Sequence, residues 1–269
     1  MKPSQPLQSI VDPFVIGCGG ELVEGLLGKN PDLPRNADYL FRERHVIAEL
    51  KALENDSFGE PFQRKMGDLL ARWMARGLLV VYGTPRIDLR QLPPVCQEEA
   101  LRVIGKPLQD SVLGRANGQI RETKKLLNMP GAKGLVMVAS DGNQDLLPSD
   151  VWFYLTRLLQ KKHEDGRPQY SHIHAIVYFN PRMLAQLPRS GQAAHLWMSG
   201  SRNNDDPELL DFLKELSEGW ARYIEKEAGL PLKRVALESL QFEDVTFAGV
   251  SRRVPRIQIS DPTDDRETK

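Results

Sequence analysis

The stretch that decides the fold is NADYLFRERHVIAELKAL, residues 36–53. Its two short apolar runs predict a pair of β-strands, at residues 38–41 and 46–50. A charged turn at residues 42–45 joins them. In a strand, side chains two residues apart project from the same face, so Glu49 and Lys51 lie together. Asp38 opens the first strand, and a hairpin folds it back beside the far end of the second. We therefore expect two carboxylates and one ammonium group at one end of a hairpin.

The charged residues of the second strand need an explanation. Glu49 interrupts an otherwise apolar run, and Lys51 follows two residues later. Burying a charge is costly unless the charge is paired with an opposite one or bound to a metal ion. A cluster at this point is more readily understood as a functional site than as part of a core, although an exposed ion-pair cluster of little energetic value is the alternative.

The order of an aspartate, ten intervening residues and then Glu-x-Lys resembles the core of the PD-(D/E)XK nuclease superfamily, which includes restriction enzymes, junction resolvases and repair nucleases. In that family Pro-Asp opens one strand and Asp/Glu-x-Lys lies on the next. The matching residues here are Asp38, Glu49 and Lys51, with Ala37 in place of the proline. The resemblance implies an α/β fold of the restriction endonuclease-like type, a mixed sheet flanked by helices. It also implies Mg²⁺ or Mn²⁺ as cofactor, bound by Asp38 and Glu49, with Lys51 as a catalytic residue.

Members of the family often add side chains from the helices before and after the hairpin. We interpret residues 14–28 as a strand end, a glycine turn and a short helix, in which Glu21 and Glu24 share one face. The resemblance makes either glutamate a candidate metal ligand, whereas the alternative is two ordinary surface acids. In the helix predicted over 117–128, the resemblance makes Gln119 a candidate site residue, with Lys124 one turn further on.

The order of elements predicts a single α/β domain over residues 1–260. It has a helical insertion after the hairpin at 52–114, a mobile loop at 180–206 and a disordered tail at 261–269. Periodicity predicts further helices at 62–77, 97–104, 149–162 and 207–228, and strands at 132–140, 172–179, 235–240 and 254–259. Residues 1–12 hold two prolines and no periodicity, so we expect a loosely docked start.

Bulk composition describes a soluble globular protein. The 269 residues are 41% hydrophobic and 27% charged, and no run approaches the ~18 apolar residues of a membrane span. The two cysteines are too few for a disulfide framework, and no secretion signal is evident, so we expect a cytoplasmic protein. The formal net charge is zero, which counts modestly against nucleic-acid binding. Two local basic clusters could nevertheless flank a groove: Arg64, Lys65, Arg72 and Arg76, and then Arg115, Arg121, Lys124 and Lys125.

The sequence thus predicts a Mg²⁺-dependent deoxyribonuclease, an endonuclease that acts on DNA in preference to RNA, with oligomeric state left open. One alternative is a non-catalytic binding or scaffold protein of the same fold. A nucleotide-binding α/β protein is the second alternative. Gly17, Gly19 and Gly20 follow an apolar run, as in a phosphate-binding turn, and Asp38 could bind a ribose. His172 and His174 have the spacing of a metal pair, although such a pair is more often structural.

Overall fold

The computed structural model describes residues 6–28, 33–53, 60–80, 92–140, 148–186, 193–203, 205–229 and 246–247. Its strands are β1 Glu21–Leu22, β2 Tyr39–Phe41, β3 Val46–Leu53, β4 Lys133–Ser140, β5 Ala175–Gln186, β6 Ala193–Ser201 and β7 Thr246–Phe247. Its α-helices are α1 Gln8–Gly17, α2 Val23–Leu27, α3 Glu60–Ala75, α4 Pro94–Pro107, α5 Arg115–Leu126, α6 Pro148–Leu159 and α7 Pro207–Ala228. A 3₁₀ turn, Arg42–Arg44, joins β2 to β3, and a π-helical segment, Leu108–Gly114, joins α4 to α5.

The strands form one mixed sheet in the order β1-β2-β3-β4-β5-β6, with β7 pairing β5. Strands β1, β2 and β3 form an antiparallel meander, β3, β4 and β5 run parallel, and β6 returns antiparallel. Parallel neighbours need a crossover, which the helices supply. The predicted α/β class with a mixed sheet flanked by helices is therefore confirmed.

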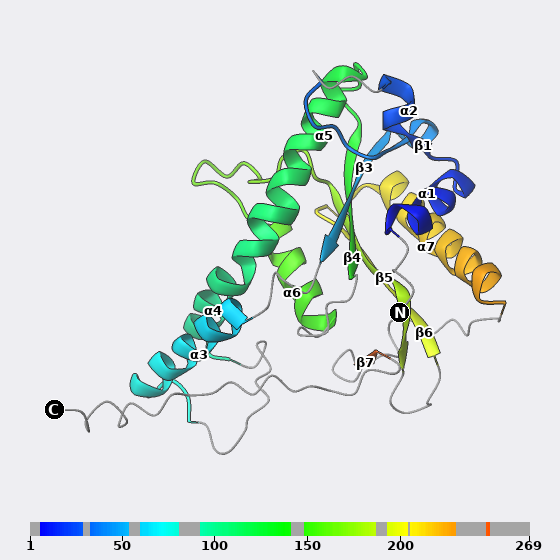
Figure 1. Ribbon diagram of the computed structural model, residues 1–269. Helices are drawn as coiled ribbons and strands as arrows, with labels where there is room; N and C mark the ends of the chain where they lie inside the picture. The colour runs from blue at the N-terminus through cyan, green and yellow to red at the C-terminus, as the bar shows by residue number, and fades with distance from the viewer. Residues whose placement is uncertain are drawn as a thin grey trace.

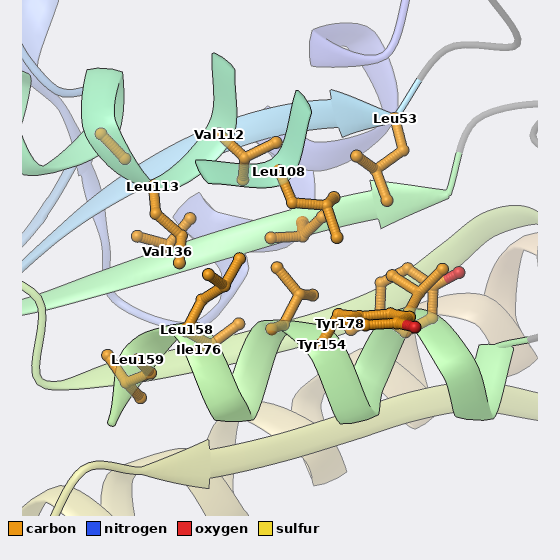
Figure 2. Packing of buried hydrophobic residues seen from close by; sticks show 14 of the residues in the cluster. Leu53, Leu108, Val112, Leu113, Val136, Tyr154, Leu158, Leu159, Ile176 and Tyr178 are labelled. Carbon is orange, nitrogen blue, oxygen red and sulfur yellow. The ribbon is translucent and has the colours of Figure 1, made fainter. Parts of the chain in front are cut away.

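Helices cover both faces of the sheet (Figure 1). Helices α3, α4, α5 and α6 cover the first face, where Figure 2 shows Leu108 and Leu113 above Val136 and, from α6, Tyr154 beside Tyr178. Helices α1 and α7 cover the second face. There an aromatic cluster surrounds Trp220, whose ring centroid lies 4.9 Å from that of Phe14 and 5.0 Å from that of Phe179. No helix in the described part of the chain is long and apolar enough to cross a membrane.

The N-terminal segment differs from the prediction. The sequence predicts a loosely docked segment at residues 1–12 and a strand end from residue 14. Instead, residues 8–17 form helix α1, because Val11, Phe14 and Val15 recur at helical spacing and are buried. Pro13 lies inside this helix on its exposed side, where the carbonyl group that it leaves unpaired can meet water.

The predicted loop at 180–206 is also wrong for most of its length. Strand β5 continues to Gln186, and Ala193–Ser201 forms β6. The loop-like residues after Phe179 lie at an irregularity, where the β5–β6 register shifts before pairing resumes at Leu184. The strands expected at 235–240 and 254–259 and the tail at 261–269 lie outside the described residues.

The other expected elements are observed with shifted ends. The helix after the hairpin begins at Arg115, the following strand begins at Lys133, and the long C-terminal helix is Pro207–Ala228. In the expected insertion, β3 runs on to Leu53 before α3, α4 and the π-helical segment. These helices are part of the main core, since Leu69, Trp73 and Ala100 pack in the same cluster as the strands.

Candidate functional site

The two edges of β3 are paired to different extents. All eight of its residues pair with β4, whereas only Val46, Ile47 and Ala48 pair with β2. Just before β2 begins, the Asp38 carboxylate replaces a backbone partner for β3. Its Oδ2 accepts a hydrogen bond of 2.8 Å from the amide of Leu50. The carboxylate therefore occupies the free edge of β3 that the short partner strand leaves.

Asp38 and Glu49 lie on the same face of the sheet. Tyr39 pairs with Ala48, so the same antiparallel register places Asp38 opposite Glu49. Leu40 lies two residues from Asp38 and Ile47 two residues from Glu49, so each projects from the same face as that acid. Leu40 and Ile47 belong to the core on the α5 side. The charge of Asp38 acts on Glu49 directly, since it is the second cause, after burial, of the raised pKa of Glu49. The structure thus brings these two carboxyl groups together.

Lys51 joins the pair through hydrogen bonds. Its Nζ donates to Glu49 Oε1 over 2.5 Å and to Gln119 Oε1 over 2.6 Å. The Gln119 amide in turn donates from Nε2 to the carbonyl of Asn36 over 3.0 Å. Gln119 therefore connects α5 to both the lysine and the segment that carries Asp38.

A second contact from α5 fixes the same segment. Thr123 Oγ1 accepts a 2.7 Å hydrogen bond from the amide of Ala37 and donates one of 2.9 Å to the carbonyl of Gln119. Thr123 is completely buried. Thr123 was not among the residues expected at the site, although its spacing of four residues from Gln119 places both on one helical face.

Burial raises the pKa values of both acids. Glu49 is 1% exposed, and burial followed by the negative charge of Asp38 raises its pKa to about 8, against the lowering effect of Lys51. Burial also raises the pKa of Asp38, although the Leu50 amide and Lys51 oppose the shift. Within the described ranges, Glu49 Oε2 receives no hydrogen bond. The site therefore holds a buried carboxylate oxygen that a proton or a cation would stabilise.

An acid from α1 also lies near the site. The Tyr39 hydroxyl donates to Asp12 Oδ1 over 2.9 Å, and the charge of Asp12 contributes to the raised pKa of Asp38. Helix α1 therefore carries an acid, Asp12, whose charge reaches Asp38. However, Asp12 bonds Tyr39, which packs on the face of the sheet opposite to the Asp38–Glu49 pair. Asp12 was missed because residues 1–12 gave no helical periodicity when read on their own.

Glu21 and Glu24 are placed differently from the prediction. Glu21 belongs to β1 instead of a helix, and its Oε1 accepts a 2.9 Å bond from Nε of the exposed Arg42. Glu24 is exposed on α2, whereas Glu49 is buried. Neither glutamate shares the buried setting of the Asp38–Glu49 pair.

Lys124 lies away from the site, although Gln119 on the same helix reaches it. Burial and the charge of Lys133 lower the pKa of Lys124 to about 8, and its own charge acts on His172 and His174. Both histidines precede β5, and His174 Nδ1 accepts a 2.9 Å bond from the amide of Gly134. Surrounding positive charge and an occupied ring nitrogen disfavour a metal site at this pair.

The glycine turn does not have the geometry of a nucleotide-binding turn. Gly17 ends α1 and Gly19 follows it, so a helix precedes the turn where a strand is needed. Asp38 begins β2 instead of ending a strand. The nucleotide-binding alternative therefore loses both of the features on which it depended.

The Asp38–Glu49 pair matches a hard divalent cation in the chemistry of its donors. No group of three or more His, Cys, Asp or Glu side chains that could hold a metal occurs among the residues the structure describes. Mg²⁺, however, commonly takes one or two carboxylates and completes its shell with water and substrate phosphate oxygens. Glu49 Oε2, which has no hydrogen-bond partner among the described residues, is a buried oxygen that could serve as a ligand of this kind.

Comparison with protein-family models, curated proteins and solved structures finds no match to this chain. The side chains gathered beside β2, β3 and α5 are therefore the basis for assigning a function.

Proposed function

We propose that this protein is a metal-dependent nuclease that hydrolyses phosphodiester bonds of DNA, built on a restriction endonuclease-like fold. The observation that carries the proposal is the placement of Asp38, Glu49 and Lys51. The two carboxyl groups share one face at the free edge of β3, and the lysine is hydrogen-bonded to one of them. A buried acid pair of this kind opposes folding, so its presence favours a functional explanation.

The order of elements supports the same proposal. A helix with an acid, α1, precedes the meander β1–β2–β3, and α5 with Gln119 leads into the buried parallel strand β4. This is the order expected from the resemblance to PD-(D/E)XK nucleases, with α3 and α4 inserted after β3. The charge of Asp12 on α1 also contributes to the raised pKa of Asp38, although its side chain bonds Tyr39.

Each residue has a distinct role in the proposed site. Mg²⁺ or Mn²⁺ bound by Asp38 and Glu49 would lower the pKa of a water molecule and offset the charge of the phosphate. Lys51 uses two of its three N–H groups on Glu49 and Gln119, which leaves one for the attacking water or a phosphate oxygen. Gln119 orients Lys51. In the reaction, the water oxygen bonds to phosphorus, one phosphorus–oxygen ester bond breaks, and the leaving oxygen takes up a proton.

The decisive experiment is a cleavage assay. Purified protein is incubated with Mg²⁺ or Mn²⁺ and plasmid, single-stranded or branched DNA, beside matched RNA and a chelator control. We expect metal-dependent cleavage of DNA that falls by about 10³-fold in Lys51→Ala and in Glu49→Gln. Lys161→Ala, at an exposed lysine next to α6, is the matched control and should cleave as the wild type does. Cleavage that survives Lys51→Ala would show that the activity comes from another site or from a contaminant.

A non-catalytic binding or scaffold protein of the same fold is the second candidate. The observation that favours it is that no three-ligand metal group occurs in the described part of the chain. In that case no substrate would be cleaved, and divalent metal would not change the thermal stability of the protein. Nucleic-acid binding without either metal effect would identify this alternative.

A further inference from the structure

Basic residues are concentrated on the helix that carries Gln119 and just after it, although the chain as a whole has no net charge. Between Arg115 and Lys133, α5 and the start of β4 contain five basic residues and one acid, Glu122. The other basic cluster, on α3, is more evenly balanced, because Arg64 faces Glu60 at 3.8 Å and Arg76 pairs with Glu99 at 2.8 Å. The structure thus distinguishes the two clusters that the sequence treated alike.

Arg115 is the member of the α5 cluster that shares a helical face with Gln119. It precedes Gln119 by four residues, which places the two side chains on one helical face, and Gln119 bonds Lys51. Arg115 is exposed, and its side chain has no ion pair or hydrogen bond to any described residue. A guanidinium group without a described partner, one helical turn from the Gln119 that bonds Lys51, is well placed to bind a phosphate.

The far end of α5 carries positive charge that lacks a partner. Lys124 is 6% exposed and makes no side-chain hydrogen bond or ion pair within the described ranges. Among the described residues, the only charge that perturbs its pKa is that of Lys133, while its own charge lowers the pKa values of His172 and His174. Lys133 is already paired with Asp206 at 2.7 Å. A largely buried lysine that has no counterion among the described residues would be stabilised by an anionic ligand.

We propose that α5 binds the phosphate backbone of the DNA substrate, with Arg115 on the phosphate nearest the site and Arg121, Lys124 and Lys125 on phosphates further along. The proposal rests on the proposed nuclease function and adds the path of the substrate to it. From Arg115 to Lys125 the helix advances by about 15 Å, enough to face several phosphates of one strand. Arg121 and Lys125 share Glu122 as their partner, at 2.8 and 3.1 Å, so that one carboxylate is set against two cations.

The test measures DNA binding separately from cleavage. All proteins carry Lys51→Ala, so that a labelled duplex in Mg²⁺ is bound without being cut, and affinity is measured across a series of salt concentrations. We expect Arg115→Gln to lower the slope of log affinity against log salt by about 1, and Arg121→Gln with Lys125→Gln to lower it by about 2. Lys124→Met should weaken binding by about tenfold, since it also removes a desolvated charge. The matched control, Lys65→Gln with Arg72→Gln on α3, should leave the slope unchanged.

The outcomes separate this inference from the proposed function. If wild-type protein cleaves DNA but the α5 variants bind with unchanged slopes, the nuclease proposal stands and the backbone path along α5 is overturned. The backbone path along α5 would also be overturned if the α3 control lowered the salt slope of DNA binding more than the α5 variants do. If the wild-type protein neither binds nor cleaves any DNA, both proposals fail. Inorganic phosphate that displaces the duplex only from proteins with Lys124 intact would support the phosphate contact at that residue.

Discussion

The neighbouring strands β3 and β4 have the same length and pair residue for residue, yet their side chains differ where the site lies. Glu49 pairs with Val136, and Lys51 pairs with Val138. Both valines are fully buried on the face covered by α5 and α6. Because valine fits at this level of the sheet, packing alone does not require a glutamate and a lysine in the adjacent strand. The charged residues of β3 are therefore a cost to the fold that a function would explain.

The difference begins at the edges of the two strands. Strand β4 lies between β3 and β5, so its backbone is paired on both sides. Strand β3 loses β2 after Ala48, and a side-chain carboxylate binds the amide of Leu50 instead. Polar side chains can gather at such a strand end because the backbone there already needs polar partners. The site can form here because β2 is short and leaves part of the edge of β3 unpaired.

The largest effect is expected when β4 is given the charge that β3 carries. Val136→Glu would bury a carboxylate beside Glu49 with no cation to pair it, so we expect the free energy of unfolding to fall by about 3–5 kcal/mol. Urea denaturation measures the change. Val80→Glu, at a valine that is 73% exposed, is the matched control and should change it by less than about 0.5 kcal/mol. A loss in Val136→Glu as small as in the control would contradict the claim that only β3 accommodates charge here.

The next effect concerns metal binding. Mn²⁺ at about one hundred times its dissociation constant should raise the free energy of unfolding of the wild-type protein by about 2.7 kcal/mol, because only the folded chain brings Asp38 and Glu49 together. Thermal denaturation with and without Mn²⁺ measures this. Asp38→Asn and Glu49→Gln should lose the effect, whereas Glu21→Gln, at a surface acid paired with Arg42, should keep it. Equal stabilisation of all four proteins would exclude this metal site.

A third effect is the pH dependence of stability in metal-free buffer. The folded-state pKa of Glu49, about 8, lies above that of the unfolded chain, so its contribution to stability is full at low pH and is lost as pH rises through about 8. Glu49→Gln removes this loss while its amide oxygen can still accept from Lys51. The variant should therefore be more stable than the wild type by about 1–3 kcal/mol at pH 9, with the difference shrinking towards pH 5. A difference that stays constant between pH 5 and 9, measured by urea denaturation, would contradict the raised pKa.

The smallest effect should come from the contact that positions the hairpin. Thr123→Val leaves the Ala37 amide without its acceptor, at a cost of about 1–2 kcal/mol in stability, and we expect cleavage to slow by about tenfold. Thr156→Val is the matched control, since its hydroxyl bonds only carbonyls of its own helix. Cleavage at the wild-type rate in Thr123→Val would show that this clamp is not needed for activity.

Much of the fold could be predicted from local pattern, because buried strands and amphipathic helices leave clear periodicities. The hairpin and the joint placement of Glu49 and Lys51 followed from the two-residue repeat of a strand. Asp12 could not be found this way, since its role depends on a contact with Tyr39 across 27 positions and on a helix that contains Pro13. Turn-forming residues after Phe179 likewise concealed a strand that continues past an irregular register.

The parallel pairing of β3 with β4 has a consequence for how the protein matures. Lys51 meets Gln119 across 68 positions of the chain, and Ala37 meets Thr123 across 86, so these contacts close only after the whole crossover has folded. A nascent or truncated chain that ends before α5 therefore lacks the residues that orient the lysine. If the proposed nuclease function holds, unfinished copies of the chain would lack a complete hydrolytic site.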